Sequence, residues 1–138
     1  MRRIDHVGVA VPDLAAARRV WDLLLDQEPE TEDVPTQKVR AASYPCGIEL
    51  IAPTAPDSPI SRFLEKRGGG IHHVTIEVAD LDAQLARLKA AGVRLLNETG
   101  VPGAGGCRVA FLHPAAAGGV LVELKQKTGG PGAGESKA

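Results

Sequence analysis

The sequence predicts an α+β fold made of two tandem βαβββ modules that together form a curved mixed sheet. The first observation is an internal repeat, because residues 6–14 and residues 73–81 both read His-Val, three residues, Val, one residue and Asp-Leu. The second is that each copy enters an alanine-rich helical run and later ends on a strand with one Glu between apolar residues, at 48–50 and at 122–124. Such a repeat indicates two copies of one supersecondary unit.

Composition excludes several classes of partner. The 138 residues carry 16 basic and 17 acidic side chains, so we expect no basic surface for nucleic acid or for a membrane. No apolar run approaches the roughly 20 residues of a membrane helix, and the first residues lack the apolar core of a signal peptide. We therefore expect a cytoplasmic protein with a small-molecule partner, in which Cys46 and Cys107 are free thiols.

The length suits one domain. We expect this domain to span residues 1–127, with module 1 at about 3–53, a linker helix at 54–69 and module 2 at about 70–126. Residues 128–138 are rich in Gly, Ser and Ala and carry charges, which predicts a flexible tail.

The first strand of module 1 should cover residues 4–11, where small and β-branched residues alternate. Side chains along a strand point to alternate faces, so His6 shares a face with Gly8 and Ala10, and the valines at 7, 9 and 11 take the other. The valine face is the one expected to pack on a helix. The face of His6 suits an open cavity, because its two neighbours are too small to fill space.

The rest of module 1 follows in order. Asp13 is the expected N-cap of a helix that ends near Asp26. Its apolar stripe is predicted to consist of Leu14, Val20, Leu24 and Leu25, with Trp21 adjoining. Residues 28–37 are expected to form a short strand or a loop, 38–44 a strand, 45–47 a turn and 48–51 the partner strand, on which Glu49 faces away from its apolar neighbours.

The linker and module 2 show the same kinds of cap, turn and strand patterns. Ser58 as cap and Pro59 at the first position predict a short helix over 60–66, which glycines 68–70 end. Residues 71–78 should form a strand, and Asp80 should cap a helix over 81–91. The chain then predicts a strand at 93–96, a glycine-rich loop at 100–106, and a hairpin of 107–112 and 120–124 around residues 113–114.

One His from the first strand and one Glu from the last strand recur in both modules, as His6 and Glu49 and as His73 and Glu123. A buried carboxylate is costly without a partner, and binding a divalent metal ion would offset that cost. Two imidazoles and two carboxylates suit zinc, cobalt, nickel, manganese or iron. On an octahedral ion they would leave two positions for water or a chelating substrate.

Simpler interpretations exist for each residue. A single strand His is more often structural, and Glu123 by itself could pair with Arg108 or Lys125. His72 competes with His73, but strand alternation and the repeat favour His73. His113 is expected in a loop near the mouth of the cavity.

Four motifs carry a resemblance to a known family: residues 4–11, residues 57–60 with 63–64, residues 70–73, and residues 111–114 followed by 119–124. With the paired modules and this ligand set, the chain resembles the vicinal oxygen chelate (glyoxalase/bleomycin resistance/dioxygenase) superfamily. Within it, the chain is similar to the methylmalonyl-CoA epimerase family, and the resemblance covers nearly all of the chain except the tail.

The resemblance implies a metal-dependent epimerase that acts on an acyl-CoA. A divalent ion such as Co, Zn, Ni, Mn or Mg, held by His6, Glu49, His73 and Glu123, would polarise the thioester carbonyl and stabilise the enolate. Epimerisation needs a base on each side of the planar enolate, and Glu123 corresponds to one base of similar enzymes. Many members of this fold form dimers, so a homodimer is expected.

The chain departs from the epimerase pattern before its third strand. Thr36 stands where similar enzymes have a Glu as second base, Lys38 replaces the usual Gly, and Glu32 and Asp33 are the nearest carboxylates in sequence. A glyoxalase I-like isomerase, another metal-dependent enzyme of the superfamily and a non-enzymatic ligand-binding protein are the alternatives. An iron-dependent extradiol oxygenase would use two His and one carboxylate, so Glu49 argues against it.

Overall fold

The computed structural model describes residues 2–127, and it divides the chain into two compact units. One unit is His6–His72, and the other joins the residues up to Asp5 to the chain from His73 onward. The boundaries between the two units therefore fall inside two strands, Arg3–Ala10 and Gly70–Glu77. The strands are β1 (Arg3–Ala10), β2 (Glu30–Val34), β3 (Val39–Ser43), β4 (Ile48–Pro53), β5 (Gly70–Glu77), β6 (Val101–Pro102), β7 (Arg108–Phe111) and β8 (Val122–Gln126), and the helices are α1 (Leu14–Leu25), α2 (Pro59–Arg67) and α3 (Leu81–Ala90).

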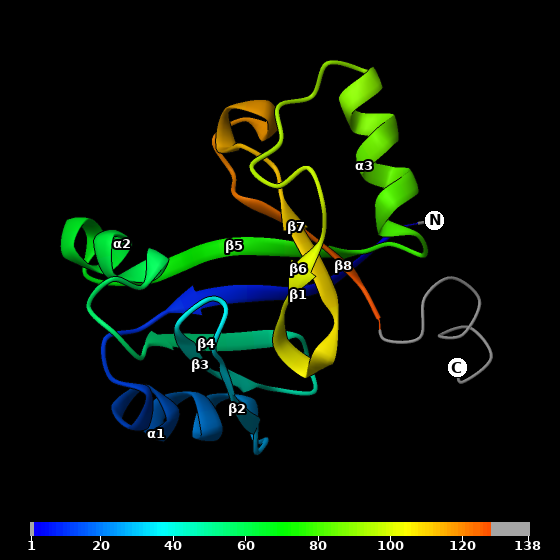
Figure 1. The fold of residues 1–138 in the computed structure, drawn as a ribbon. Coiled ribbons are helices and arrows are strands. Elements are labelled where there is room, and N and C mark those ends of the chain that lie inside the picture. The colour runs from blue at the N-terminus through cyan, green and yellow to red at the C-terminus, as the bar shows by residue number, and fades with distance from the viewer. Residues whose placement is uncertain (1, 128–138) are drawn as a thin grey trace. The chain divides into compact units, whose positions relative to one another are not determined.

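Each unit contains one βαβββ module, as predicted, so the α+β class is confirmed (Figure 1). Module 1 runs β1, α1, β2, β3, β4 and has the strand order β2-β3-β4-β1; module 2 runs β5, α3, β6, β7, β8 and has the order β5-β8-β7-β6. In both modules the first and last strands are parallel neighbours, and the other strands pair antiparallel. The duplication read from the sequence is thus a duplication of topology.

Helix α1 begins and ends where its caps predict. The Asp13 side chain accepts a hydrogen bond from the Ala16 N–H at 3.1 Å, and Asp26 adopts the left-handed conformation (φ 52°) that ends the helix. The predicted apolar stripe is partly wrong, because Val20 and Leu24 are 63% and 66% exposed. The face that packs on the module 1 core instead carries Leu14, Ala17, Trp21 and Leu25.

The core of module 1 lies between α1 and one face of its sheet, and it contains the residues Val9, Val11, Ala42, Tyr44, Leu50 and Ala52. Tyr44 is its polar member. The Tyr44 hydroxyl donates to Asp22 of α1 at 2.5 Å, and the Arg18 guanidinium donates to the other oxygen of that carboxylate at 3.1 Å. Burial, and then the bond to Asp22, raise the pKa of Tyr44 to about 12, and the two donated bonds lower the pKa of Asp22.

The linker helix α2 starts at Pro59, as predicted, but Ser58 does not cap it with its side chain. The Ser58 hydroxyl instead donates to the Gln37 carbonyl oxygen of the β2–β3 turn at 3.4 Å, which ties the linker to module 1. Gly68 ends α2 in the left-handed conformation (φ 74°) that favours glycine.

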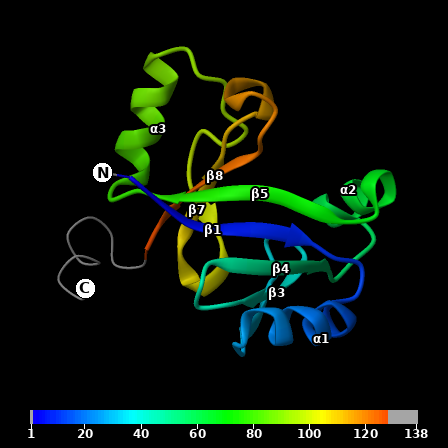
Figure 2. The ribbon, with the colours of Figure 1, turned by 180° about the vertical axis from the view of Figure 1, so that it is seen from behind.

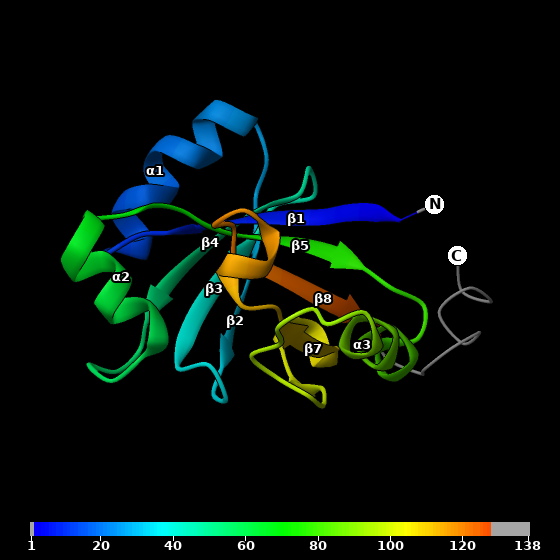
Figure 3. The same cartoon turned by 90° about the horizontal axis from the view of Figure 1, so that it is seen from above.

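Module 2 packs α3 against β7 and β8 (Figures 2 and 3). Asp80 caps α3 by accepting from the Ala83 N–H at 3.1 Å, and Leu81 and Leu85 are buried. The strand predicted at 93–96 is wrong. Only one isolated bridge, Leu95 to Leu112, forms in that segment, and the second strand of the module is β6, inside the predicted glycine-rich loop. The predicted hairpin around residues 113–114 is confirmed as β7 and β8.

Residues 2–127 test three smaller predictions, on a strand, on the cysteines and on membrane helices. The segment 28–37 contains the strand β2. Cys46 and Cys107 are free cysteines, as expected. Within the part of the chain that the structure describes, we find no helix whose length and apolar character would let it cross a membrane. The predicted tail at 128–138 lies outside the described residues, and the single domain over 1–127 stays a prediction.

Candidate active site

In module 1, His6 and Glu49 lie on the same face of neighbouring strands. The parallel register places Gly8 opposite Glu49, and His6 is two residues before Gly8 on β1. Both side chains are buried, at 9% and 8% exposure, and His6 Nε2 lies 3.5 Å from Glu49 Oε1. The other carboxylate oxygen, Oε2, accepts a hydrogen bond from the Ser43 hydroxyl of β3 at 3.1 Å. Module 1 therefore presents a buried imidazole–carboxylate pair opposite its helix-packed face.

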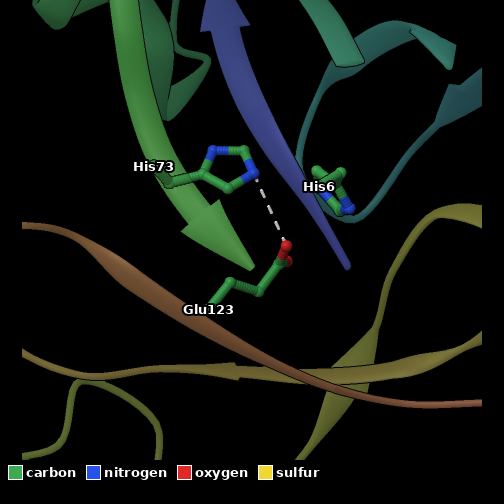
Figure 4. Close-up of side chains that lie close together, drawn as sticks. All are labelled: His6, His73 and Glu123. Carbon is green, nitrogen blue, oxygen red and sulfur yellow. Dashed lines mark ion pairs between the residues drawn. The ribbon is translucent and has the colours of Figure 1, made fainter. Parts of the chain in front are cut away.

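Module 2 presents the equivalent pair, His73 and Glu123 (Figure 4). The register places Thr75 of β5 opposite Glu123 of β8, and His73 is two residues before Thr75. Both members are 5% exposed, and His73 Nε2 lies 3.5 Å from Glu123 Oε1. The Thr75 hydroxyl donates to the same oxygen at 2.6 Å, and Phe111 meets the His73 ring edge-on at 6.3 Å between centroids.

The two hydroxyl donors, Ser43 and Thr75, are the residues that sequence reasoning missed. Ser43 stands directly opposite Glu49 on β3, and Thr75 stands directly opposite Glu123 on β5. A small hydroxyl residue opposite a buried Glu was the available signal, but it can be used only once the strand register is known. The hydroxyl reaches the carboxylate from β3 in module 1 and from the first strand in module 2.

The side chains of the two His–Glu pairs are of the types that bind a divalent metal ion. Each pair combines an imidazole nitrogen with a carboxylate oxygen, and all four side chains are at most 9% exposed. An ionised carboxylate is expensive to bury without compensation, and an imidazole and a hydroxyl beside each one offset part of that cost. Imidazole with carboxylate is the ligand set that Zn, Co, Ni, Mn or Fe accepts.

The structure shows what His72, Arg108 and Lys125, the residues of the competing interpretations, contact. His72, next to His73 on β5, meets Phe63 edge-on at 5.0 Å, and burial lowers the pKa of His72. This packing is the structural role expected for the alternate face of the strand. Arg108 pairs with Asp82 at 3.0 Å, and Lys125 pairs with Asp5 at 3.0 Å.

His113 lies in the loop that joins β7 to β8. Its Nδ1 accepts a hydrogen bond from the Ala115 N–H at 3.0 Å and caps the turn Pro114–Ala117. Its predicted place near a cavity mouth stays a prediction.

Thr36 lies in the turn between β2 and β3, where Gln37 N–H bonds the Val34 carbonyl at 3.1 Å. Lys38 has a φ of 52°, a left-handed conformation that glycine adopts most easily. The glycine that the resemblance implies at this position would adopt the same conformation without strain. The Lys38 ammonium ion-pairs with Asp57 beside the linker helix.

Comparison with known proteins places these modules in one family. The model of the Glyoxalase/Bleomycin resistance protein/Dioxygenase superfamily matches residues 5–111. The chain is 43% identical over 129 residues to the mitochondrial methylmalonyl-CoA epimerase of Bos taurus, which covers 90% of this chain and 74% of the relative. It is 45% identical over 131 residues to the ethylmalonyl-CoA/methylmalonyl-CoA epimerase of Cereibacter sphaeroides, which covers 90% of this chain and 97% of the relative.

A solved structure supports the same relationship. A variant of methylmalonyl-CoA epimerase from Streptomyces coelicolor, in complex with 2-nitronate-propionyl-CoA, superposes with a TM-score of 0.86 at 36% identity. The match covers 91% of this chain and 97% of that chain.

Proposed function

This chain belongs to the glyoxalase/bleomycin resistance protein/dioxygenase superfamily, and we propose that it is an epimerase that interconverts the two epimers of methylmalonyl-CoA. The observation that carries the proposal is the buried His–Glu pair that recurs in both modules. It occurs in a chain that is 43% and 45% identical to relatives named for this reaction. Ethylmalonyl-CoA is a second candidate substrate, because the relative from Cereibacter sphaeroides is named for both acyl groups.

The two pairs, His6 with Glu49 and His73 with Glu123, are proposed to hold one divalent ion, with Co, Zn, Ni, Mn and Mg as candidates. In support, each module buries one imidazole beside one carboxylate, His6 with Glu49 and His73 with Glu123. When bound, such an ion supplies Lewis-acid polarisation of the thioester carbonyl, which makes the α-hydrogen more acidic.

The proton itself must be moved by the chain. In one direction, the Glu123 carboxylate accepts the α-proton: the C–H bond breaks, an O–H bond forms, and the electron pair remains on the α-carbon and the adjacent carbonyl. A second group then returns a proton to the opposite face of the planar carbon, which inverts its configuration. In the reverse direction the two groups exchange roles, and exchange with water restores their protonation.

Glu32 is the proposed second group. In the register of module 1, Glu32 pairs with Ala41, and Ala41 pairs with Ile51. Directly opposed side chains share a face, and Ile51 is two residues after Glu49 on β4. Glu32 therefore lies on the face of Glu49, roughly 10 Å across the sheet at two strand spacings. Its exposure allows proton exchange with water.

Asp33 fits this role less well because it lies on the opposite face. It pairs with Arg40 in the register, and the two side chains form an ion pair at 2.9 Å. Arg40 lines a cavity of about 560 Å³ together with α1 residues such as Leu14 and Arg18. Asp33 is thus on the helix side of the sheet, away from the face of His6 and Glu49.

The test is proton NMR of each separate methylmalonyl-CoA epimer in deuterated water with Co2+-loaded protein. We expect α-hydrogen exchange together with inversion for both epimers, and loss of inversion in Glu123→Gln. No exchange with either epimer of methylmalonyl-CoA or ethylmalonyl-CoA would contradict the proposal. The homodimer and the cytoplasmic location stay predictions, and the relative from Bos taurus is named as mitochondrial.

A further inference from the structure

Module 1 has a cavity on the face of its sheet that packs on α1. The cavity has a volume of about 560 Å³ and lies between the N-terminal part of α1 and the strands β2, β3 and β4. Arg40 of β3 lines it and stands directly opposite Ala52 of β4, which belongs to the helix-packed core. Glu49 points to the other face of β4, so this cavity is separate from the His6–Glu49 pair.

The size and the apolar wall of the cavity suit a small organic molecule. Its apolar lining consists of Pro12, Leu14, Ala15, Ala52 and Pro53. Ala52 is 7% exposed and has only a methyl group, so it leaves space in the wall. Other lining side chains are exposed, so the cavity opens to solvent. Pockets of roughly 300–1,000 Å³ with an apolar wall and a few polar groups are typical of small-molecule sites.

The polar lining carries more positive than negative charge. Arg18 lines the cavity from α1 and Arg40 lines it from β3, and Thr31 and Thr54 add hydroxyl groups. Among the described residues that line the cavity, Asp13 is the one acidic side chain. Its carboxylate accepts a hydrogen bond from a backbone N–H of α1 at 3.1 Å, so it is already engaged as the helix cap.

Each guanidinium is oriented by a carboxylate that does not line the cavity. Asp22 accepts from Nε and Nη2 of Arg18 at 3.5 and 3.1 Å. Asp33 accepts from Nη1 of Arg40 at 2.9 Å. A guanidinium has five N–H donors, so these bonds leave donors on both side chains for a further acceptor. An arginine that is already oriented also loses less conformational entropy when it binds.

We infer that this cavity binds a small organic anion, with a carboxylate or phosphate group held by Arg18 and Arg40 and a short apolar body beside Ala52. The planar guanidinium matches both head groups, because its paired N–H donors fit two oxygens of a carboxylate or a phosphate. The inference goes beyond the proposed function, because the cavity uses neither His–Glu pair and needs no metal ion.

The test is ligand titration of isotope-labelled, metal-free protein at constant ionic strength, followed by NMR of backbone amides and arginine Nε–H groups. Butyrate and butyl phosphate have both an anionic group and an apolar body, whereas inorganic phosphate has only the first and butanol only the second. We expect butyrate or butyl phosphate to shift the signals of the lining residues with a Kd on the order of 1 mM. Inorganic phosphate and butanol should each bind about 10-fold more weakly.

The tighter of the two compounds identifies the head group, carboxylate or phosphate. Equally weak binding of all four compounds, or shifts confined to residues outside the cavity, would overturn the inference.

Two variants locate the binding, and a third is the matched control. Arg40→Gln should weaken binding of the tighter compound about 10-fold, because it removes one charged donor group. Ala52→Leu should weaken it at least as much by filling the cavity, and Arg40→Gln covers the case in which this core variant does not fold. Arg19→Gln changes the neighbour of Arg18 on α1, which does not line the cavity, and should retain the affinity.

Unchanged affinity in Arg40→Gln, or an equal loss in Arg19→Gln, would show that the anion does not bind in this cavity. Glu123→Gln, which tests the proposed function, should bind the anion as the unmodified protein does. The two proposals can therefore fail independently, since one is read from anion binding without metal and the other from exchange of the α-hydrogen.

Discussion

At the scale of single residues, the resemblance to the epimerase family implies a carboxylate in the β2–β3 turn where this chain has Thr36. Thr36 supplies a hydroxyl in place of a carboxylate, and a neutral hydroxyl is a poor proton acceptor near pH 7. The strand that leads into the turn nevertheless carries two adjacent carboxylates on opposite faces, Glu32 and Asp33. Only Glu32 shares the face of the ligand pair, so the loss at Thr36 can be compensated four residues earlier.

Glu32→Gln should therefore separate exchange from inversion. Glu123 remains, so we expect α-hydrogen exchange in deuterated water to persist with one methylmalonyl-CoA epimer, while inversion falls about 100-fold or more. Asp33→Asn is the matched control and should retain inversion, since Asp33 pairs with Arg40 on the helix side. Loss of inversion in Asp33→Asn but not in Glu32→Gln would show that the assignment by face is wrong.

At the scale of elements, α1 is attached to its sheet by an apolar stripe and by one polar cluster. Tyr44 on the sheet side and Arg18 on the helix both donate to the Asp22 carboxylate. A hydroxyl, a guanidinium and a carboxylate therefore meet beside the module 1 core. The cluster fixes α1 against the residue that precedes the β3–β4 turn. Its contribution depends on the ionisation of Asp22.

Tyr44→Phe tests this cluster and its pH dependence. We expect the variant to lower the free energy of unfolding by about 1 kcal/mol at pH 7, because it removes one hydrogen bond to a carboxylate. The folded-state pKa of Asp22 is lowered below 3.8, mainly by that bond, so the stabilisation is present above 3.8 and is lost as pH falls through the folded-state value. Urea unfolding at pH 7 and near pH 2 measures it.

The difference between the two proteins should shrink at the lower pH. The pKa of Tyr44 itself is raised to about 12, so its hydroxyl remains protonated throughout this range. A difference that stays constant with pH would mean that the hydroxyl stabilises the fold through a group other than ionised Asp22.

At the scale of the whole molecule, each module supplies half of the proposed ligand set. A separate ion in each module would give two Co2+ per chain, whereas a shared ion gives one. The stoichiometry therefore tests the proposal that the two pairs act together.

We expect one Co2+ per chain by calorimetry. At free Co2+ of 100 times its Kd, the ion should raise the free energy of unfolding by about 2.7 kcal/mol, and EDTA should remove this gain together with the activity. His6→Gln and His73→Gln, one in each module, should each abolish high-affinity binding. Retention of half the bound Co2+ in either variant would indicate independent sites.

The duplicated architecture and the residues that the two modules present could be predicted from the amino-acid sequence. Strand alternation and the repeat are local properties, so the faces of His6 and His73 and the central position of both glutamates could be predicted without a structure. The caps Asp13 and Asp80 were predictable for the same reason, because each bonds a backbone N–H three residues ahead.

The hydrogen bonds that connect those residues could not be predicted from the sequence, because they depend on the packing of distant segments. The bond from Thr75 to Glu123 joins residues 48 apart in sequence, and no local pattern specifies which oxygen accepts it. Three other findings could not be predicted for the same reason. They are the exposure of Val20 and Leu24, the absence of a strand at 93–96, and the bond from Ser58 to the β2–β3 turn. Each depends on how a segment packs against a partner distant in the chain, and periodicity records only that a face is apolar or polar.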